Sequence, residues 1–314
     1  MLGGKCLPDE HRGENVAVHI LRYLRPGLPG SRVGVLTGDR VSELDGVPSL
    51  ASLWSLPMDQ IREAVSDPDG PEWELAALTV LAPVDGRTEV WASGVTYETS
   101  REARQEESEH EADIYARVYN AERPELFFKS AAWRVAGSGW PIAVREDSAV
   151  SVPEPEVALV VNAFGEIIGY TACDDVSSRS IEGENPLYLP QAKTYLGGCA
   201  LGPMIRPAWE VADPYALGIE MTILRGGHAE WAGTASTSQL RRRYDELVSY
   251  LMRADIHPDG VVLSTGTCLV PAAPFTLEEG HVVRITIDEI GTLENPVVRG
   301  LPAIRAGYGP SILG

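Results

Sequence analysis

Two glutamates one residue apart, each preceded by a proline, are the residues in this sequence whose spacing points most directly to chemistry. The segment Pro-Glu-Pro-Glu (153–156) leads straight into the apolar run VALVV (157–161). In an extended chain, residues i and i+2 point to the same face, so Glu154 and Glu156 would project together. Carboxylates that close repel each other unless a positive charge lies between them. A divalent cation between them would explain the pair.

A predicted hairpin brings further carboxylates to the same place. The run VALVV is followed by turn residues (162–165) and by EIIGYTAC (166–173), so the two strands should lie side by side. Asp174 and Asp175 then lie near the end at which the first strand begins. Oxygen ligands without histidine or cysteine favour Mg²⁺, Mn²⁺ or Ca²⁺ over zinc. Solvated acids that flank a hairpin are the alternative, and the spacing alone leaves both interpretations open.

Two lysines in apolar or glycine-rich surroundings are further candidates. Lys129 lies near the end of the predicted strand ELFFKSA (125–131), and Lys193 lies within YLPQAKTYLGG (188–198). Most lysines are solvated, so neither position alone indicates catalysis.

A Thr-Gly-Thr segment (265–267) follows a predicted buried strand near the C-terminus. Hydroxyl groups and glycine amides in this pattern can hold a carboxylate, although they also occur in structural turns. The sequence contains no G-x-S-x-G elbow, no P-loop and no G-x-G-x-x-G, and its six histidines are scattered.

Composition excludes several classes of protein. The 314 residues carry a net charge of −19, which argues against nucleic-acid binding because phosphate recognition needs basic faces. No apolar run approaches the roughly 20 residues of a membrane helix, and the N-terminus lacks the apolar region of a secretory signal. We therefore expect a cytoplasmic protein without a membrane partner. The four cysteines form no C-x-x-C pair, which predicts buried free thiols.

The elements that must position these residues fall into two predicted domains. Residues 1–80 form a small N-terminal α+β domain, with a hairpin at 32–46 and short helices at 50–65. A strand at 76–85 should lead into the catalytic domain, residues 81–314.

In the second domain, strands should outnumber helices. The pattern predicts a helix over 101–120, capped by Thr99, and irregular chain over 176–203. An amphipathic helix from Leu240 to Leu251 would carry three arginines (241–243) on its solvated face. Two last strands are predicted at 261–267 and 281–291. Short strands with few crossover helices indicate an α+β, mainly β, mixed-sheet fold rather than a doubly wound one.

Four segments together resemble the fumarylacetoacetate hydrolase superfamily, over about residues 88–300. They are VPEPEVALVV (152–161), GYTACDDVSSRS (169–180), AKTYLGGCALGP (192–203) and VVLSTGT (261–267). The resemblance implies a mixed β-sheet roll or barrel of that type behind a small N-terminal domain. It also implies Mg²⁺, or Mn²⁺ in its place, bound by Glu154, Glu156 and Asp175.

The resemblance also implies roles at the substrate. Lys193 would lie beside the metal and the substrate, and Thr265 and Thr267 would contact the substrate carboxylate. Where the C–C hydrolases of the superfamily have a catalytic histidine, this chain has Ala103, which makes water activation harder to explain. Further substrate contacts are predicted for Ser178, Arg179 and Tyr188.

The segments at 94–108, 123–129 and 182–193 resemble the sugar-acid branch, the 2-keto-3-deoxy-D-pentonate dehydratases. That likeness implies conversion of 2-dehydro-3-deoxy-D-pentonate (2-keto-3-deoxy-D-arabinonate or xylonate) to 2,5-dioxopentanoate through a metal-stabilised enolate. The reaction needs one base and one acid. Our candidates are Lys193 and Glu125, with Lys129 and Glu106 in support.

Two other functions stay open at this point. One is a hydrolase of the same superfamily that cleaves a 2,4-diketo acid, and the other is a metal-dependent binder of sugar acids without catalysis. Either would take a small 2-keto acid as its partner. Relatives in the superfamily lead us to expect a homodimer or a homotetramer.

Overall fold

Two mixed β-sheets dominate the computed structural model, which describes residues 17–97 and 117–308. The larger sheet has 11 strands in the order β4-β3-β2-β1-β13-β11-β10-β16-β6-β7, with β5 paired to β1. All of its pairs are antiparallel except β16 with β6. Its strands are β1 (Val18–Leu24), β2 (Ser31–Thr37), β3 (Arg40–Glu43), β4 (Glu72–Glu74), β5 (Thr79–Val80), β6 (Glu89–Gly94), β7 (Glu125–Ala131), β10 (Pro155–Val161), β11 (Ile167–Asp175), β13 (Cys199–Pro207) and β16 (Val261–Ser264).

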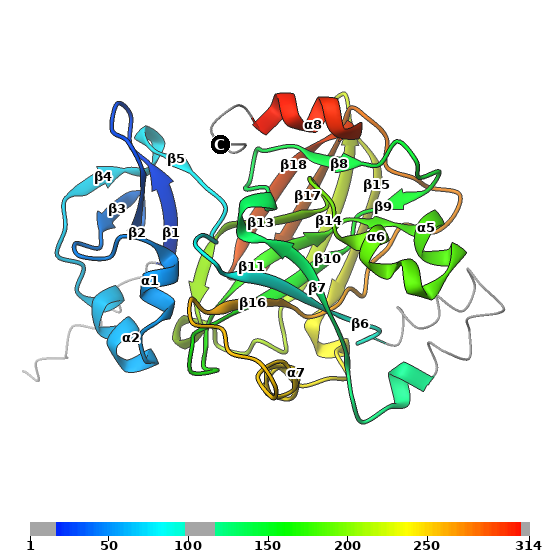
Figure 1. Cartoon of the computed structure of the whole chain (residues 1–314). Helices are drawn as coiled ribbons and strands as arrows, with labels where there is room; N and C mark the ends of the chain where they lie inside the picture. The colour runs from blue at the N-terminus through cyan, green and yellow to red at the C-terminus, as the bar shows by residue number, and fades with distance from the viewer. Residues whose placement is uncertain (1–16, 98–116, 309–314) are drawn as a thin grey trace, which may run out of the picture.

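A second sheet of five strands packs against the first, in the order β15-β14-β17-β18-β8 (Figure 1). Here only β18 and β8 are parallel. The predicted α+β, mainly β, mixed-sheet fold is confirmed, and both sheets are open. The strands are β8 (Ile142–Val144), β14 (Gly218–Arg225), β15 (His228–Ser236), β17 (His281–Ile287) and β18 (Gly291–Arg299), and a separate ribbon pairs β9 (Ser151–Val152) with β12 (Ser177–Ser178).

The helices are short and lie around the sheets (Figure 1). None in the described part of the chain is long and apolar enough to cross a membrane. The α-helices are α1 (Leu50–Trp54), α2 (Met58–Ser66), α5 (Arg179–Glu184), α6 (Leu189–Lys193), α7 (Tyr244–Leu251) and α8 (Gly300–Tyr308), and the 3₁₀ turns are η1 (Leu75–Ala77), η2 (Ala132–Arg134), η3 (Pro186–Tyr188), η4 (Ala208–Glu210) and η5 (Thr237–Gln239).

Strand β10 is buried on both faces, which explains why its sequence is a continuous apolar run. Val157 and Leu159 belong to the core between the two sheets. Ala158 and Val160 point the other way, into a second core with residues of the N-terminal segment such as Trp54. The strand that begins within the glutamate pair is therefore held from both sides.

The N-terminal segment extends the large sheet. Strand β1 pairs with β13 at Ile20 and Ile205, and the hairpin β2–β3 follows with Gly38 at its turn, as predicted. Helices α1 and α2 confirm the predicted helical stretches. Figure 1 shows this segment, in blue and cyan, beside the rest of the chain. The division into domains at residue 80 stays a prediction.

Several predicted elements differ from the structure. The strand expected at 76–85 is only β5, a two-residue partner of β1, because η1 and proline-containing chain occupy the rest; β6 enters the second part instead. Residues 176–203 are not irregular, since they contain α5, α6 and the start of β13. The strand expected at 261–267 ends at Ser264, and the one at 281–291 ends at Ile287, where a turn leads into β18.

The three arginines at 241–243 precede α7 and do not form its solvated face. Arg242 is buried, and its guanidinium donates to main-chain carbonyls of Ala121 and Glu122 and pairs with Glu246. The predicted helix over 101–120 is seen only at 117–120, because residues 98–116 lie outside the described part. Cys173 and Cys199 are buried free thiols and Cys268 is a half-buried one, while Cys6 lies outside it.

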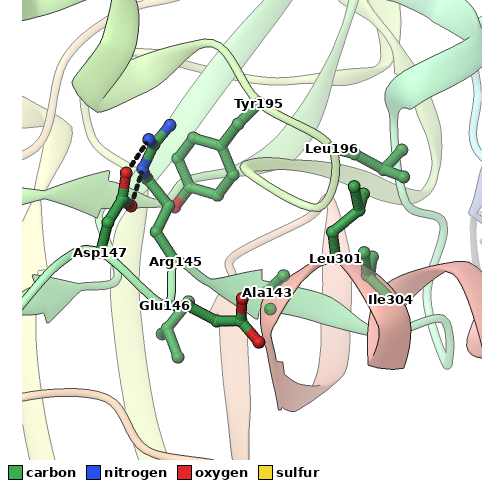
Figure 2. A pocket seen from close by; sticks show the side chains of 10 residues that line it. Ala143, Arg145, Glu146, Asp147, Tyr195, Leu196, Leu301 and Ile304 are labelled. Atoms are coloured by element: carbon green, nitrogen blue, oxygen red, sulfur yellow. Dashed lines mark hydrogen bonds and ion pairs between the residues drawn. The ribbon is translucent and has the colours of Figure 1, made fainter.

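A pocket of about 380 Å³ opens between β8, α8 and the turn after α6 (Figure 2). Arg145 forms an ion pair with Asp147 at its edge, and Tyr195 and Leu301 line it. The predicted carboxylate ligands are not among its lining residues.

Candidate metal centre

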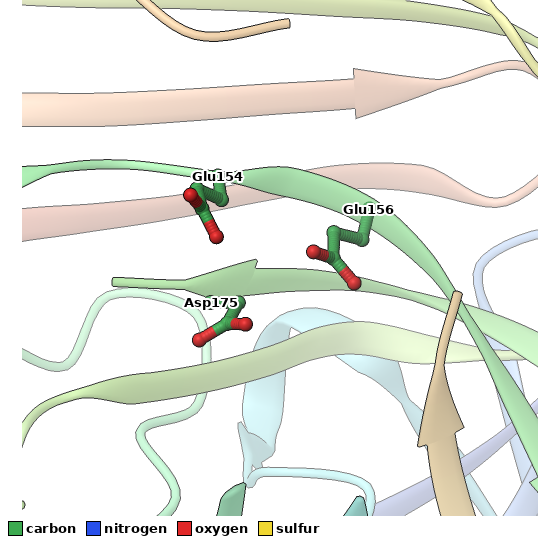
Figure 3. Close-up of side chains that lie close together, drawn as sticks. All are labelled: Glu154, Glu156 and Asp175. Atoms are coloured by element: carbon green, nitrogen blue, oxygen red, sulfur yellow. The ribbon is translucent and has the colours of Figure 1, made fainter. Parts of the chain in front are cut away.

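Three carboxylates meet at one end of β10 and β11. Oxygen atoms of Glu154, Glu156 and Asp175 lie within 4.8 Å of one another, and each residue is at most 2% exposed (Figure 3). Antiparallel pairing of the two strands, with Pro155 opposite Asp174, places them there. The hairpin inferred from the sequence is therefore confirmed.

Glu156 is the carboxylate whose described contacts are all neutral. Its Oε2 accepts hydrogen bonds from the Ser264 hydroxyl (2.5 Å) and from the Gly266 N–H (2.8 Å). Among residues 17–97 and 117–308, no lysine or arginine forms an ion pair with it. Burial raises its pKa well above the ordinary value, and the charges of Asp175 and Glu154 raise it further. A bound cation would reverse this penalty, so the site favours a positive charge at this carboxylate.

Lys193 contacts two of the three carboxylates. Its Nζ donates to Glu154 Oε2 at 2.5 Å, to Asp175 Oδ2 at 3.0 Å and to the Ser177 hydroxyl at 2.5 Å. Helix α6 ends at this residue, and its side chain is buried. The structure therefore brings the predicted catalytic lysine to the predicted metal ligands.

Lys129 lies at the same cluster because β7 contains a bulge. Trp91 pairs with Phe128 and Val90 with Ser130, which leaves Lys129 as the extra residue. Bulges of this kind often redirect a side chain beside an active site. The Lys129 Nζ forms an ion pair with Asp175 and donates to the carbonyl groups of Val176 (3.0 Å) and Lys193 (2.7 Å).

These two lysines account for all but one in the chain. The sequence contains three lysines, and the third, Lys5, lies outside the described part. Lys129 and Lys193 are 1% and 2% exposed. Buried lysines are rare unless they are paired, and both of these form ion pairs with the buried carboxylates instead of extending to the surface.

Asp174 faces away from the three-carboxylate group and is completely buried. Burial raises its pKa to about 7, although a hydrogen bond from the Glu154 N–H opposes the rise. Consecutive strand residues point to opposite faces, so its neighbour Asp175 joins the group and Asp174 does not.

Two residues predicted to contact the substrate, Arg179 and Ser178, bind other side chains of the protein. Arg179 donates to Glu154 Oε1 at 2.7 Å and lies 3.9 Å from Glu182. The Ser178 hydroxyl donates to that of Ser148 at 2.7 Å. Tyr188 is half-buried in η3. Their contact with substrate stays a prediction.

The Thr-Gly-Thr segment lies against β10. The hydroxyls of Thr265 and Thr267 donate to the carbonyl groups of Val157 (2.8 Å) and Pro155 (3.0 Å). Gly266 has a φ of 93°, which turns its N–H toward Glu156. Sequence analysis singled out this segment and the ability of its glycine amide to hold a carboxylate, but it missed Ser264 and did not foresee that the carboxylate is that of the predicted ligand Glu156. The substrate role of the threonines stays a prediction.

Glu125, the predicted partner of Lys193, begins β7 and is half-buried. Its carboxylate lies directly over Gly94, where a Cβ would be 2.1 Å from Oε2. Phe127 points to the same side of the strand, and its ring centroid is 5.6 Å from the Lys193 Nζ. Glu106 and Ala103 lie outside the described residues.

The donor set fits a hard divalent cation. Three buried carboxylates without histidine or cysteine suit Mg²⁺ or Mn²⁺, which bind oxygen ligands. The adjacent lysine supplies a group that can exchange a proton beside such an ion. The arrangement suits chemistry in which a metal polarises a substrate and a side chain moves its protons.

Comparisons with known proteins agree with this geometry. Residues 89–298 match a family model described as fumarylacetoacetate (FAA) hydrolase C-terminal. A 2-dehydro-3-deoxy-D-arabinonate dehydratase from Saccharolobus solfataricus is 45% identical over 228 residues, which cover 72% of this chain and 76% of the relative. A probable 2-keto-3-deoxyxylonate dehydratase from Haloferax volcanii is 47% identical over 249 residues, covering 79% of this chain and 85% of that protein.

Solved structures are similar over nearly the whole chain. The apo form of a 2-keto-3-deoxy-D-arabinonate dehydratase superposes with a TM-score of 0.78 at 35% identity, covering 90% of this chain and 99% of that one. A second structure is that of a 2-keto-3-deoxy-D-arabinonate dehydratase complexed with magnesium and 2,5-dioxopentanoate. It gives a TM-score of 0.77 at 35% identity and covers 89% of this chain and 98% of its own.

Proposed function

The chain belongs to the fumarylacetoacetate hydrolase family, and we propose that it is a magnesium-dependent dehydratase of a 2-keto-3-deoxy sugar acid. The reaction converts 2-dehydro-3-deoxy-D-pentonate to 2,5-dioxopentanoate with loss of one water. The ion would be held by Glu154, Glu156 and Asp175.

One observation carries the proposal: the Lys193 ammonium contacts two of the three carboxylates that would hold the ion. A hydration shell alone would satisfy solvated acids at a surface. Here the acids are buried and share a buried lysine, which places a proton-exchanging group beside the ion. That combination supports a reacting site more strongly than a storage site for a cation.

Elimination of water requires two proton movements, and the unsaturated 5-hydroxy acid that it leaves then tautomerises to the C5 aldehyde. When bound, Mg²⁺ would act as a Lewis acid and make the C3 hydrogens of a 2-keto acid more acidic. The protein then accepts a proton from C3 and gives one to the C4 hydroxyl, which leaves as water. We propose Lys193 and Glu125 as this pair, with Glu106 in support. The hydrogen bonds of Lys129 suit a supporting role, since they hold Asp175 and the main chain of Lys193 in place.

Binding of the substrate would use polar groups around the carboxylates. Arg179 offers a positive charge beside Glu154, and Gly266 lies between two threonines close to Glu156. The residues proposed to contact substrate are Ser178, Arg179, Tyr188, Thr265 and Thr267. A cytoplasmic location and a homodimeric or homotetrameric assembly are also proposals, and size-exclusion chromatography with light scattering tests the second.

An assay with competing substrates tests the function. Purified protein with Mg²⁺ is given 2-keto-3-deoxy-D-arabinonate, and aldehyde formation is followed by coupled NAD(P)⁺ reduction. We expect aldehyde from the sugar acid and no cleavage of a 2,4-diketo acid. Cleavage of the diketo acid without aldehyde would favour a hydrolase, and tight binding of the sugar acid without turnover would favour a binding protein.

A further inference from the structure

We infer that Asp174 is a positioning residue that fixes the main chain of Glu154 and thereby sets the affinity of the carboxylate group for its ion. The inference rests on the proposed metal site but not on the dehydration. Asp174 is not among the three carboxylates that meet, and as the neighbour of Asp175 in β11 its side chain projects from the opposite face of the strand.

The chain around Glu154 cannot be held by ordinary strand pairing. Strand β9 ends at Val152 and β10 begins at Pro155, so Glu154 lies in the break between them. Pro153 and Pro155 have no N–H, which leaves that of Glu154 as the only main-chain donor of the three residues. An unpaired donor in this buried place would be destabilising, because no water replaces the hydrogen bond that it loses.

The Asp174 carboxylate accepts the hydrogen bond of that N–H. Its Oδ1 lies 3.0 Å from the Glu154 nitrogen, and its side chain is 0% exposed. The next residue holds the carbonyl group, since the Asp175 N–H donates to the Glu154 carbonyl at 3.0 Å. We call these two hydrogen bonds on the main chain of Glu154 the clamp. Two consecutive residues therefore hold both polar groups of Glu154, and one of them, Asp175, is a ligand of the same ion.

The clamp links the geometry of two ligands. The hydrogen bond from the Glu154 N–H to Asp174 Oδ1 fixes the main chain at Glu154, so Asp174 restrains the direction in which the Glu154 side chain leaves it. Partners that orient metal ligands change metal affinity about 10- to 100-fold when they are removed. Asp174 should have an effect of this size without touching the ion.

The test compares two substitutions of nearly equal shape. Asp174→Asn keeps an oxygen that can accept from Glu154, whereas Asp174→Leu has the same branching but no acceptor. Binding of Mn²⁺, which replaces Mg²⁺ at oxygen sites, is titrated by electron paramagnetic resonance on the full-length chain without substrate. We expect Asp174→Leu to weaken Mn²⁺ binding at least about 10-fold and Asp174→Asn to change it less than about threefold.

A matched control separates positioning from general stability. Asp85 is also a buried carboxylate, and it accepts hydrogen bonds from the main-chain N–H groups of Leu50 (3.1 Å) and Ala51 (2.8 Å). It lies in the N-terminal part of the chain and is not one of the grouped carboxylates. Asp85→Leu should lower the melting temperature and leave Mn²⁺ affinity unchanged. If Asp174→Leu does not fold, Asp174→Ser replaces it, because the shorter hydroxyl does not reach the Glu154 N–H.

Three results would overturn the inference. They are wild-type Mn²⁺ affinity in Asp174→Leu, an equal loss of affinity in Asp174→Asn, and an equal loss in Asp85→Leu, since the effect would then follow stability. Because the titration needs no turnover, the expected shifts in a protein without dehydratase activity would support the clamp and contradict only the proposed reaction.

Discussion

The ammonium nitrogen of Lys193 lies 2.5 Å from Oε2 of Glu154, so the predicted proton-transfer group and a predicted metal ligand are in direct contact. Substitution of this lysine should separate the two functions. Lys193→Met removes the proton-transfer group and also a positive charge that opposes the cation. We expect turnover to fall about 100-fold or more and Mn²⁺ binding to stay as tight or become tighter.

Arg206→Met is the control for that variant. Arg206 is likewise a buried cation, but it donates to the carbonyl groups of Val18 and Glu210. Its loss should affect stability and leave turnover per folded molecule unchanged. If Lys193→Met retained turnover, Lys193 would have no part in proton transfer.

Glu156 gives a different prediction, because it is the carboxylate whose described contacts are neutral. Glu156→Gln keeps the shape of the side chain and removes its charge. We expect Mn²⁺ affinity to fall more than about 100-fold and turnover to disappear with it. Isothermal titration calorimetry with Mn²⁺ measures the affinity, and the dehydration assay measures the turnover.

Glu43→Gln provides the comparison, since Glu43 is a buried glutamate that pairs with Arg25 and Arg32 in the N-terminal segment. It should leave metal binding intact. If Glu156→Gln bound Mn²⁺ as tightly as the wild type does, Glu156 would not be a ligand of the metal.

Gly266 has to remain glycine for two reasons that can be measured separately. Its φ is 93°, and a Cβ would lie 2.0 Å from the Thr96 hydroxyl oxygen. Gly227 also has a positive φ, 83°, but nothing lies within 4 Å of a Cβ there. Gly227→Ala should therefore cost about 1–2 kcal/mol of unfolding free energy from the backbone alone.

Gly266→Ala should lower the free energy of unfolding more than Gly227→Ala does, because the added methyl group also displaces Thr96. It should also weaken Mn²⁺ binding, because it moves the N–H that donates a hydrogen bond to Glu156. Urea unfolding of both variants gives the difference. Equal losses would mean that the close packing of this turn contributes nothing.

His19 predicts how stability depends on pH. Burial lowers its pKa below 6.5, and the nearby charge of Arg206 lowers it further. As the pH falls below 6.5, the unfolded chain binds a proton at His19 before the folded chain does, so stability decreases toward acid. His19→Gln should remove this contribution, and urea unfolding at pH 7.5 and pH 5 measures it. An unchanged difference between the two pH values in the variant would contradict the assignment.

Local patterns in the sequence account for the centre of the site. The i, i+2 spacing of Glu154 and Glu156 and the short hairpin to Asp175 depend only on neighbouring residues, and the structure confirms both. The strand that carries Lys129 could be predicted in the same way, because it depends on a short stretch of sequence. The free thiols followed from the wide spacing of the cysteines and the absence of a C-x-x-C pair.

The parts that sequence analysis missed depend on contacts between distant segments. Ser264 and Gly266 reach Glu156 because β16 pairs with β10, about 100 residues earlier in the chain, and no local periodicity encodes that pairing. The bulge at Lys129 is likewise a property of the β6–β7 pair. Helices α5 and α6 are only six and five residues long, too short for a helical period to stand out among glycines and prolines.

The central claim is that the three buried carboxylates hold Mg²⁺ for a dehydration in which Lys193 takes part. Proton NMR of 2-keto-3-deoxy-D-arabinonate with the purified protein tests it most directly, recorded first in EDTA and then after addition of excess Mg²⁺. We predict that the aldehyde proton of 2,5-dioxopentanoate appears only after Mg²⁺ is added, and never with Glu156→Gln. An aldehyde signal of equal rate in EDTA, or none with Mg²⁺, would contradict the account.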